Sequence, residues 1–277
     1  EQWEVQSAPP DRTPLNFSDV WASSPSDAWA TRDDGTLHQW DGTRWARRAD
    51  APLMGMYAIS GSSASDVWVA GRMNGTYEAA LVHFDGTRWR ETRFAESETF
   101  VDVWALRQDA AWALSRTGTV RRWEGAAWRT VVNVNRVFTA LHGSSEDNVW
   151  VVGDSGALYQ WDGQRWVDHC FTGPDLKAVW VVGPDDVWAS ALDGALWHWD
   201  GRRMLRVEGV APVYVRAFFG RGAQDLWAVG EQGAILHWDG ATWAPVSSGT
   251  RRHLRGLWGA GGRLFAAGTN ATVLQRD

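Results

Sequence analysis

The sequence predicts an all-β fold, a seven-bladed β-propeller with four antiparallel strands in each blade. Three observations predict it. A Trp-Asp-Gly tripeptide or a close variant recurs every 38 to 44 residues along the 277-residue chain. Each copy lies between short segments of alternating apolar and polar residues, and both chain ends carry an incomplete repeat. Repeats of about 40 residues that each hold four short strands are typical of propeller blades.

The repeats follow one another without an intervening linker. They are marked by the first residue of the tripeptide, which is Trp40, Phe84, Trp123, Trp161, Trp199 and Trp238, with a degraded copy at Arg276-Asp277. We therefore expect one propeller over residues 1–277, with blades near 14–49, 53–93, 98–132, 136–170, 174–209, 213–248 and 252–277 plus 1–7.

Each repeat shows the same order of four predicted strands, which we name a to d. Strand a resembles "FSDVWA" (17–22), strand b "DVWVAG" (66–71), strand c "AILHW" (234–238) and strand d "ATWAPV" (241–246). Asp-Gly pairs join strands c and d, and such pairs are the strongest short hairpin signal.

The last repeat stops at "QRD" (275–277) and has no strand d, whereas the chain begins with "EQWEVQ", which reads as an isolated strand d. Residues 1–7 are therefore predicted to complete the last blade. Closing the ring in this way removes an open sheet edge, which would otherwise favour aggregation.

Tryptophan is unusually frequent, with 22 residues. All but Trp197 fall into four columns, one for each strand, and we interpret them as the packing between blades. Trp197 belongs to a variable column that also contains Tyr159.

Composition excludes several classes of function. A net charge of −6 argues against binding to a nucleic-acid backbone, and no apolar run approaches the length of a membrane span. A single Cys excludes an internal disulfide and a multi-cysteine zinc site, and no metal, cofactor or catalytic motif is present. Because the chain begins with Glu1, we expect that a preceding segment was removed, which is a signal peptide, a tag or a flanking domain. We expect the protein to be extracellular or periplasmic.

The blades "DVWASALDGALWHWDG" (186–201) and "DLWAVGEQGAILHWDGATW" (225–243) resemble those of seven-bladed bacterial fucose-binding lectins and, more loosely, tectonin-type repeats. The resemblance implies sugar sites between adjacent blades, built from aromatic, Arg, Glu, Gln and His side chains. The chain departs from the lectins because it lacks a Trp-Trp-Asp-Gly doublet.

These observations favour a non-enzymatic binding module for carbohydrate, with sites between blades or at the channel mouth. The alternative is a scaffold for protein–protein interaction, similar to the photosystem assembly-factor type. A hydrolase or lyase with a single channel-mouth site comes third. The partner is then a glycan or a protein ligand, while the oligomeric state is left open.

Three groups of residues are candidates for ligand binding. Between blades, Trp197 and Tyr159 are placed to stack on a sugar ring beside His198. His198 shares a column with His83, His237, Gln39, Arg122, Gln160 and Gln275, which is either a polar ring of the framework or a repeated sugar site.

The other two groups are expected at the channel mouth. The second residue of strand a becomes cationic in the last three blades, as Lys177, Arg216 and Arg255, with Tyr214 and His253 two residues before the last two of these. Blade 2 carries an insertion (71–80) in the loop between strands b and c, which offers Arg72, Tyr77 and Glu78. We assign no catalytic residue and no metal ligand.

Overall fold

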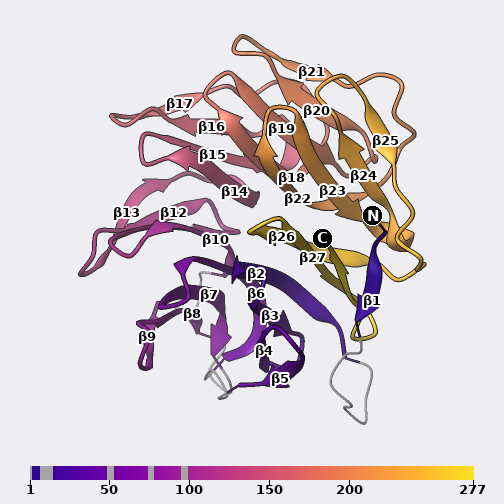
Figure 1. Cartoon of the computed structure of the whole chain (residues 1–277). Helices are drawn as coiled ribbons and strands as arrows, with labels where there is room; N and C mark the ends of the chain where they lie inside the picture. The colour runs from indigo at the N-terminus through magenta and orange to yellow at the C-terminus, as the bar shows by residue number, and fades with distance from the viewer. Residues whose placement is uncertain (1, 7–14, 49–52, 74–77, 95–98) are drawn as a thin grey trace.

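The computed structural model describes residues 2–6, 15–48, 53–73, 78–94 and 99–277. It contains seven four-stranded antiparallel sheets arranged as blades around a central channel (Figure 1). The predicted seven-bladed β-propeller is confirmed. In every blade the strands pair in the order a, b, c, d from the channel outwards.

The strands occupy equivalent positions from blade to blade. In blade order, strand a is β2 (Phe17–Ser24), β6 (Leu53–Ser63), β10 (Phe100–Arg107), β14 (Phe138–Ser145), β18 (Leu176–Gly183), β22 (Val215–Gly222) and β26 (Leu254–Ala260). Strand b is β3 (Asp27–Arg32), β7 (Asp66–Met73), β11 (Ala110–Ser115), β15 (Asn148–Gly153), β19 (Asp186–Ala191), β23 (Asp225–Gly230) and β27 (Arg263–Gly268).

The outer strands are shorter. Strand c is β4 (Leu37–Trp40), β8 (Ala79–Phe84), β12 (Thr119–Trp123), β16 (Leu158–Trp161), β20 (Leu196–Trp199), β24 (Ile235–Trp238) and β28 (Val273–Arg276). Strand d is β5 (Trp45–Arg47), β9 (Trp89–Arg93), β13 (Trp128–Asn133), β17 (Trp166–Asp168), β21 (Met204–Arg206), β25 (Trp243–Pro245) and, for blade 7, β1 (Glu4–Gln6). Two 3₁₀ turns, η1 (Asp154–Gly156) and η2 (Glu231–Gly233), join strands b and c in blades 4 and 6.

The N-terminal strand closes the ring as predicted. β1 pairs antiparallel with β28, with Val5 opposite Leu274, and Figure 1 shows this indigo strand beside the yellow strands of the last blade. Trp3, just before β1, is buried, and its ring centroid lies 6.0 Å from that of Trp227 in blade 6. Blade 7 is therefore held together by both ends of the chain.

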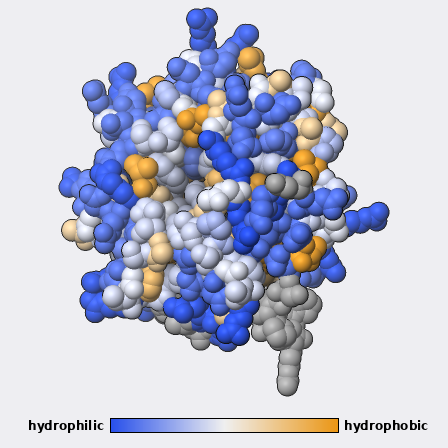
Figure 2. Space-filling model, viewed as in Figure 1, coloured by the Kyte–Doolittle hydropathy of each residue, from blue (hydrophilic) through white to orange (hydrophobic). Residues whose placement is uncertain are grey.

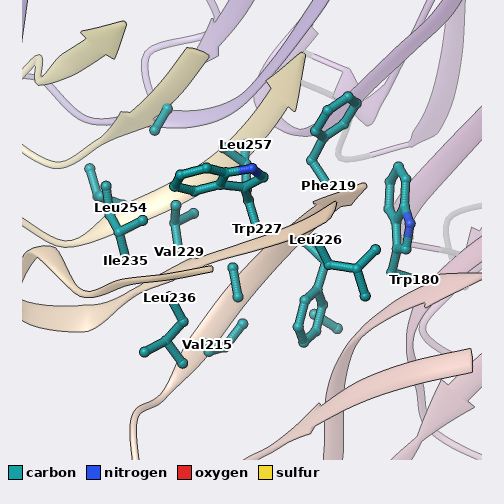
Figure 3. Close-up of a cluster of buried hydrophobic side chains, with 14 of the residues drawn as sticks. Trp180, Val215, Phe219, Leu226, Trp227, Val229, Ile235, Leu236, Leu254 and Leu257 are labelled. Atoms are coloured by element: carbon teal, nitrogen blue, oxygen red, sulfur yellow. The ribbon is translucent and has the colours of Figure 1, made fainter. Parts of the chain in front are cut away.

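The core lies between the blades. The strand-b tryptophan of one blade packs against the strand-c and strand-d aromatic rings of the next, as Trp68 does with Trp123 at 5.2 Å and Trp128 at 5.1 Å. Figure 3 shows one such cluster, in which Trp227 lies among aliphatic side chains that include Leu254 and Leu257 of blade 7. These contacts bear out the interpretation of the tryptophan columns as packing between blades.

The Asp-Gly turns form for a local reason. In blade 1, Oδ1 of Asp41 accepts hydrogen bonds from the backbone N–H groups of Thr43 and Arg44, both at 2.9 Å, and Gly42 has a φ of +93°. The hydroxyl of Thr43 also donates to this carboxylate, and these bonds lower the pKa of Asp41 to about 2. A residue with a Cβ adopts that φ poorly, so the tripeptide specifies the hairpin.

The insertion in blade 2 differs in part from its expected form. The sequence predicts a loop over residues 71–80, but β7 continues to Met73 and β8 begins at Ala79, so both strands are longer than their counterparts. The added residues prolong the hairpin because Arg72 and Ala79 pair across it. Tyr77 lies outside the described residues.

The face seen in Figure 2 is mainly hydrophilic, with hydrophobic residues in small separate groups. No helix in the described part of the chain is long and apolar enough to cross a membrane.

Candidate functional site

One end of the central channel widens into a mouth of about 620 Å³. The second residue of strand a contributes to its lining in all seven blades, as Ser18, Tyr57, Val101, Thr139, Lys177, Arg216 and Arg255. The column that the repeat alignment defined is therefore brought together here. Loops between strands b and c add Asp33, Arg116 and Leu192.

The three predicted cations gather on one side of the mouth, and each faces a carboxylate. Nζ of Lys177 lies 2.9 Å from Oδ1 of Asp154. Arg216 pairs with Glu231 at 2.8 Å, and Arg255 of blade 7 pairs with Asp33 of blade 1 at 3.3 Å. These ion pairs hold the cations in place and balance much of their charge.

The residues flanking the cations also lie near the mouth. The guanidinium of Arg216 lies 4.8 Å above the ring of Tyr214, which lines the mouth. His253 accepts a hydrogen bond at Nδ1 from the backbone N–H of Gln232, at 3.1 Å. The ring of Tyr214 therefore stacks beneath the guanidinium of Arg216, whereas His253 is hydrogen-bonded to the turn that contains Gln232.

On the opposite side of the mouth the strand-a positions are uncharged, and the loops between strands b and c contribute Asp33 and Arg116. This side comprises the strand-a residues of blades 1 to 4, among which Tyr57 is 43% exposed. On the cationic side, Leu192 is 52% exposed. Large apolar side chains with this exposure are few in the described part of the chain, so the mouth combines charge with accessible apolar surface.

Below the mouth, a narrower part of the channel of about 190 Å³ is lined by two half-buried carboxyl groups, those of Asp19 and Asp102. Asp19 accepts hydrogen bonds from the backbone N–H groups of Val20 at 2.8 Å and of Ile59, in the next blade, at 3.0 Å. Asp102 accepts from Val103 and Leu141, both at 2.8 Å. Burial raises the pKa of each carboxyl to about 7.

The far end of the channel is lined by aromatic rings. Phe219 lies 5.5 Å from Trp180 and 5.6 Å from Trp258, and these two tryptophans lie 6.0 Å apart. His142 stacks on Trp180 at 4.0 Å and accepts at Nδ1 from the N–H of Val181, so it is a core residue. Burial lowers the pKa of His142 to about 3.

Of the blade-2 candidates, Arg72 and Glu78 are not brought into the mouth lining. Arg72 donates a hydrogen bond to Oγ1 of Thr99 at 2.9 Å, and only Thr99 of this pair lines the mouth. Glu78 forms an ion pair with Arg93 at 3.2 Å, on the outer strand of the same blade.

The interblade candidates contact framework residues. Nε2 of His198 lies 2.8 Å from Oδ1 of Asp186, and its ring stacks on Trp188 at 4.2 Å. The neighbouring Trp197 packs against Phe171 at 5.1 Å. Tyr159 meets Phe138 edge-on at 5.7 Å in blade 4.

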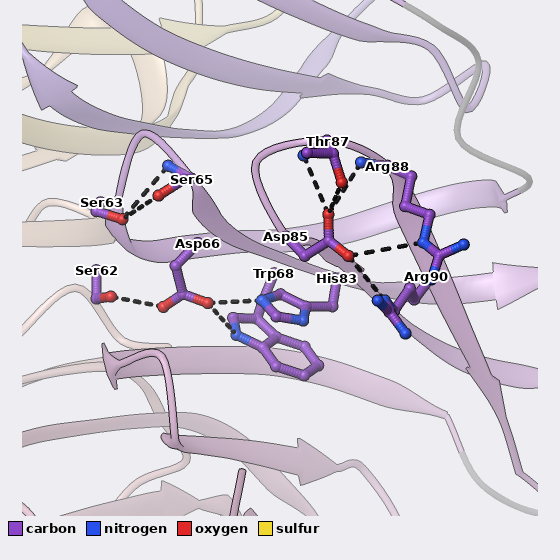
Figure 4. Close-up of polar contacts among 10 residues, drawn as sticks. All are labelled: Ser62, Ser63, Ser65, Asp66, Trp68, His83, Asp85, Thr87, Arg88 and Arg90. Atoms are coloured by element: carbon purple, nitrogen blue, oxygen red, sulfur yellow. Dashed lines mark hydrogen bonds and ion pairs between the residues drawn. The ribbon is translucent and has the colours of Figure 1, made fainter. Parts of the chain in front are cut away.

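The polar column of His198 repeats this arrangement in other blades. In blade 2, Asp66 accepts from Nε1 of Trp68 at 3.2 Å and bonds His83 at 2.6 Å, while the two rings stack 3.9 Å apart (Figure 4). Six of the seven column members bond to carboxylate or amide groups in this way, and these are Gln39, His83, Arg122, Gln160, His198 and His237. These bonds fit the interpretation of the column as a polar ring of the framework.

Gln275 is the seventh member, and it lies at a feature that sequence reasoning missed. A groove of about 460 Å³ runs between blade 7 and blade 1, lined by Gln275, Arg263, Trp40 and residues of β1. The signal in the sequence is Arg263, which stands where most blades begin strand b with Asp or Asn.

Metal ligands are not clustered in the part of the chain that the structure describes, where no group of three or more His, Cys, Asp and Glu residues is placed to hold an ion.

Comparison with known proteins supports the fold. No family model and no curated protein sequence matches the chain. Among solved structures, it is similar to YCF48 bound to D1 peptide, with a TM-score of 0.79, 17% identity and coverage of 99% of this chain and 95% of that one. It is also similar to the WD40 β-propeller domain of Doa1, with a TM-score of 0.79, 13% identity and coverage of 99% and 96%.

A third similar structure is a catalytically inactive virginiamycin B lyase from Staphylococcus aureus with quinupristin, with a TM-score of 0.81, 11% identity and coverage of 99% of both chains. At these identities the likeness shows the propeller architecture alone. Because a peptide-bound propeller and a lyase share this architecture, it does not decide between binding and catalysis.

Proposed function

We propose that the protein is a binding module whose channel mouth takes a segment of a polypeptide partner. An acidic side chain of the partner is held by the cations of blades 5 to 7. The observation that carries this proposal is the asymmetry of the strand-a positions at the mouth, where Lys177, Arg216 and Arg255 of blades 5 to 7 face uncharged strand-a residues of blades 1 to 4.

The chemistry of the mouth fits an acidic peptide. Arginine binds carboxylates in a planar geometry, and the ion pairs with Glu231 and Asp33 keep Arg216 and Arg255 oriented. Exposed aromatic and aliphatic groups, here Tyr57 and Leu192, supply apolar contacts of the kind that dominate binding energy at protein interfaces. A volume of about 620 Å³ accommodates a few side chains.

The similar propeller bound to a D1 peptide supports this proposal, because it shows that such an architecture takes a peptide ligand. Saccharide binding at Trp197, His198 and Tyr159 stays a prediction. It is less favoured because His198 already bonds Asp186 and stacks on Trp188.

The test is an array of short acidic, basic and neutral peptides probed with the labelled protein, in parallel with a glycan array. Hits are titrated by calorimetry. We expect acidic peptides to bind, and Arg216→Gln combined with Arg255→Gln to weaken binding by about tenfold or more. Added salt weakens the interaction in the same direction.

The matched control is Arg165→Gln. Arg165 is an exposed arginine paired with Asp162 in the turn between strands c and d of blade 4, away from the mouth. The proposal is wrong if peptide binding survives in the double variant, or if the control weakens it equally. Binding of glycans alone, abolished by the mouth substitutions, also overturns it.

A further inference from the structure

The groove between blades 7 and 1 is where the repeating polar framework is interrupted. In blade 4, Gln160 donates to Oδ1 of Asn148 at 3.0 Å, and in blade 1 Gln39 donates to Asp27 at 2.5 Å. Blade 7 keeps the donor, Gln275, but has Arg263 in place of the acceptor.

Arg263 does not replace the missing partner. Its guanidinium donates to the backbone carbonyl of Pro25 in blade 1 at 3.3 Å and pairs with Asp277. Gln275 is only 6% exposed, yet its Nε2 has no hydrogen-bond partner among the described residues. A buried amide donor left in this state is unfavourable, so the groove contains an unused recognition group.

A groove lies beside the side-chain amide of Gln275. The strand-b ring of blade 7 is Phe265, whereas the other six blades have the larger tryptophan, and its centroid is 6.3 Å from that of Trp45 across the seam. The groove of about 460 Å³ lies within the range of small-molecule sites. Trp40 is the aromatic side chain of its lining, and Gln2 and Glu4 of the N-terminal segment also contribute to it.

The lining indicates the class of ligand. The charges of Arg263 and Arg276 are balanced by those of Glu4 and Asp277, so an anion or a cation would meet like charge on part of the wall. Amide side chains, including Gln2 and Gln275, each offer donors and acceptors. Hydroxyl groups also donate and accept, and they complement such a mixed polar surface without carrying charge.

We propose that this groove binds one neutral saccharide ring, free or at the end of a glycan, and that Nε2 of Gln275 donates to one of its oxygens. The site is independent of the channel mouth and of the interblade positions Trp197 and His198. It predicts one saccharide per chain, because only blade 7 has the unpartnered amide in the described structure.

The experiment is a glycan array of neutral and acidic glycans, followed by calorimetric titration of the hits. We expect neutral glycans to bind with a stoichiometry of one. Gln275→Leu removes the amide and weakens binding by about tenfold or more. Gln160→Leu is the matched control in the same column, and we expect it to leave the affinity unchanged.

A second variant separates recognition from folding. Arg263→Asp supplies the acceptor that other blades have, so the amide of Gln275 becomes engaged within the chain. We expect glycan binding to weaken by about tenfold or more. Because Arg263 also bonds Pro25 and Asp277, thermal unfolding of the variant is measured alongside, and a cooperative transition shows that the blade still folds.

The proposal is overturned if no neutral glycan binds, if several bind per chain, or if Gln275→Leu and Arg263→Asp leave the affinity unchanged. Equal weakening by Gln160→Leu also overturns it. The mouth variants leave this site intact, so failure here and failure of peptide binding are separate results.

Discussion

The indole of Trp104 in blade 3 lies against the backbone of Gly143 in blade 4, so closely that a Cβ on Gly143 would stand 2.6 Å from Cζ3 of the ring. The same relationship joins Trp21 to Gly61, Trp180 to Gly220 and Phe219 to Gly259. Where strand a carries a smaller group, the next blade has a side chain and donates its N–H instead. Ala105 donates to Ser60 and Val181 to His142, both at 3.0 Å.

Gly143→Ala should therefore lower the free energy of unfolding by about 1–3 kcal/mol, because the added methyl group meets a packed ring. Gly183→Ala is the control, since no heavy atom lies within 4 Å of a Cβ built there. Urea denaturation measures both. Trp104→Ser with Gly143→Ala reproduces the pairing of Ser60 with Ala105, so the double variant should cost less than the sum of the single ones; simple additivity would contradict this account.

The half-buried carboxyls of the channel should make stability depend on pH. Asp19 and Asp102 have pKa values raised to about 7 from 3.8, so the native state binds more protons than the unfolded chain between these values. The free energy of unfolding therefore falls as the pH rises from about 4 to 7, and levels off above 7.

Denaturant titrations at about pH 5 and pH 8 test this dependence. The double variant Asp19→Asn with Asp102→Asn should flatten the pH dependence of stability. Asp109→Asn, at an exposed position, should leave this dependence unchanged. Parallel pH profiles of the wild type and the double variant would show that these carboxyls do not titrate in this range.

Removal of an aspartate acceptor from the polar framework should lower the free energy of unfolding more where that aspartate is buried. The side chain of Asp66 is 2% exposed and forms hydrogen bonds with Ser62, Trp68 and His83 (Figure 4). The side chain of the equivalent Asp225 is 33% exposed. Asp66→Ala should lower the free energy of unfolding by about 1–3 kcal/mol, and Asp225→Ala by less, because water replaces the lost acceptor there. Equal losses in thermal and chemical denaturation would refute this ranking.

Ring closure depends on Trp3. Trp3→Ala should destabilise the protein by about 3–5 kcal/mol, because the buried ring packs against Trp227. Val5→Ala, at a position 61% exposed on the same strand, should change stability little. Chemical denaturation monitored by tryptophan fluorescence gives both values, and a small effect of Trp3→Ala would mean that β1 is dispensable.

The sequence alone determined the number of blades, the order of strands and the closure by residues 1–7. These follow from a local repeat, since Asp-Gly turns and alternating strands specify hairpins without reference to the rest of the molecule. The alignment of the repeats also identified the seven strand-a residues that line the channel mouth, because equivalent positions of a symmetric ring lie at the same distance from its axis.

Only the tertiary structure decided which of these residues have partners. Asp33 meets Arg255 although 222 positions separate them, and the amide of Gln275 is unsatisfied although its column is polar throughout. The pairing of Trp104 with Gly143 is likewise invisible within one repeat. Each of these depends on contacts between blades, and a repeat read by itself does not contain the blade that it packs against.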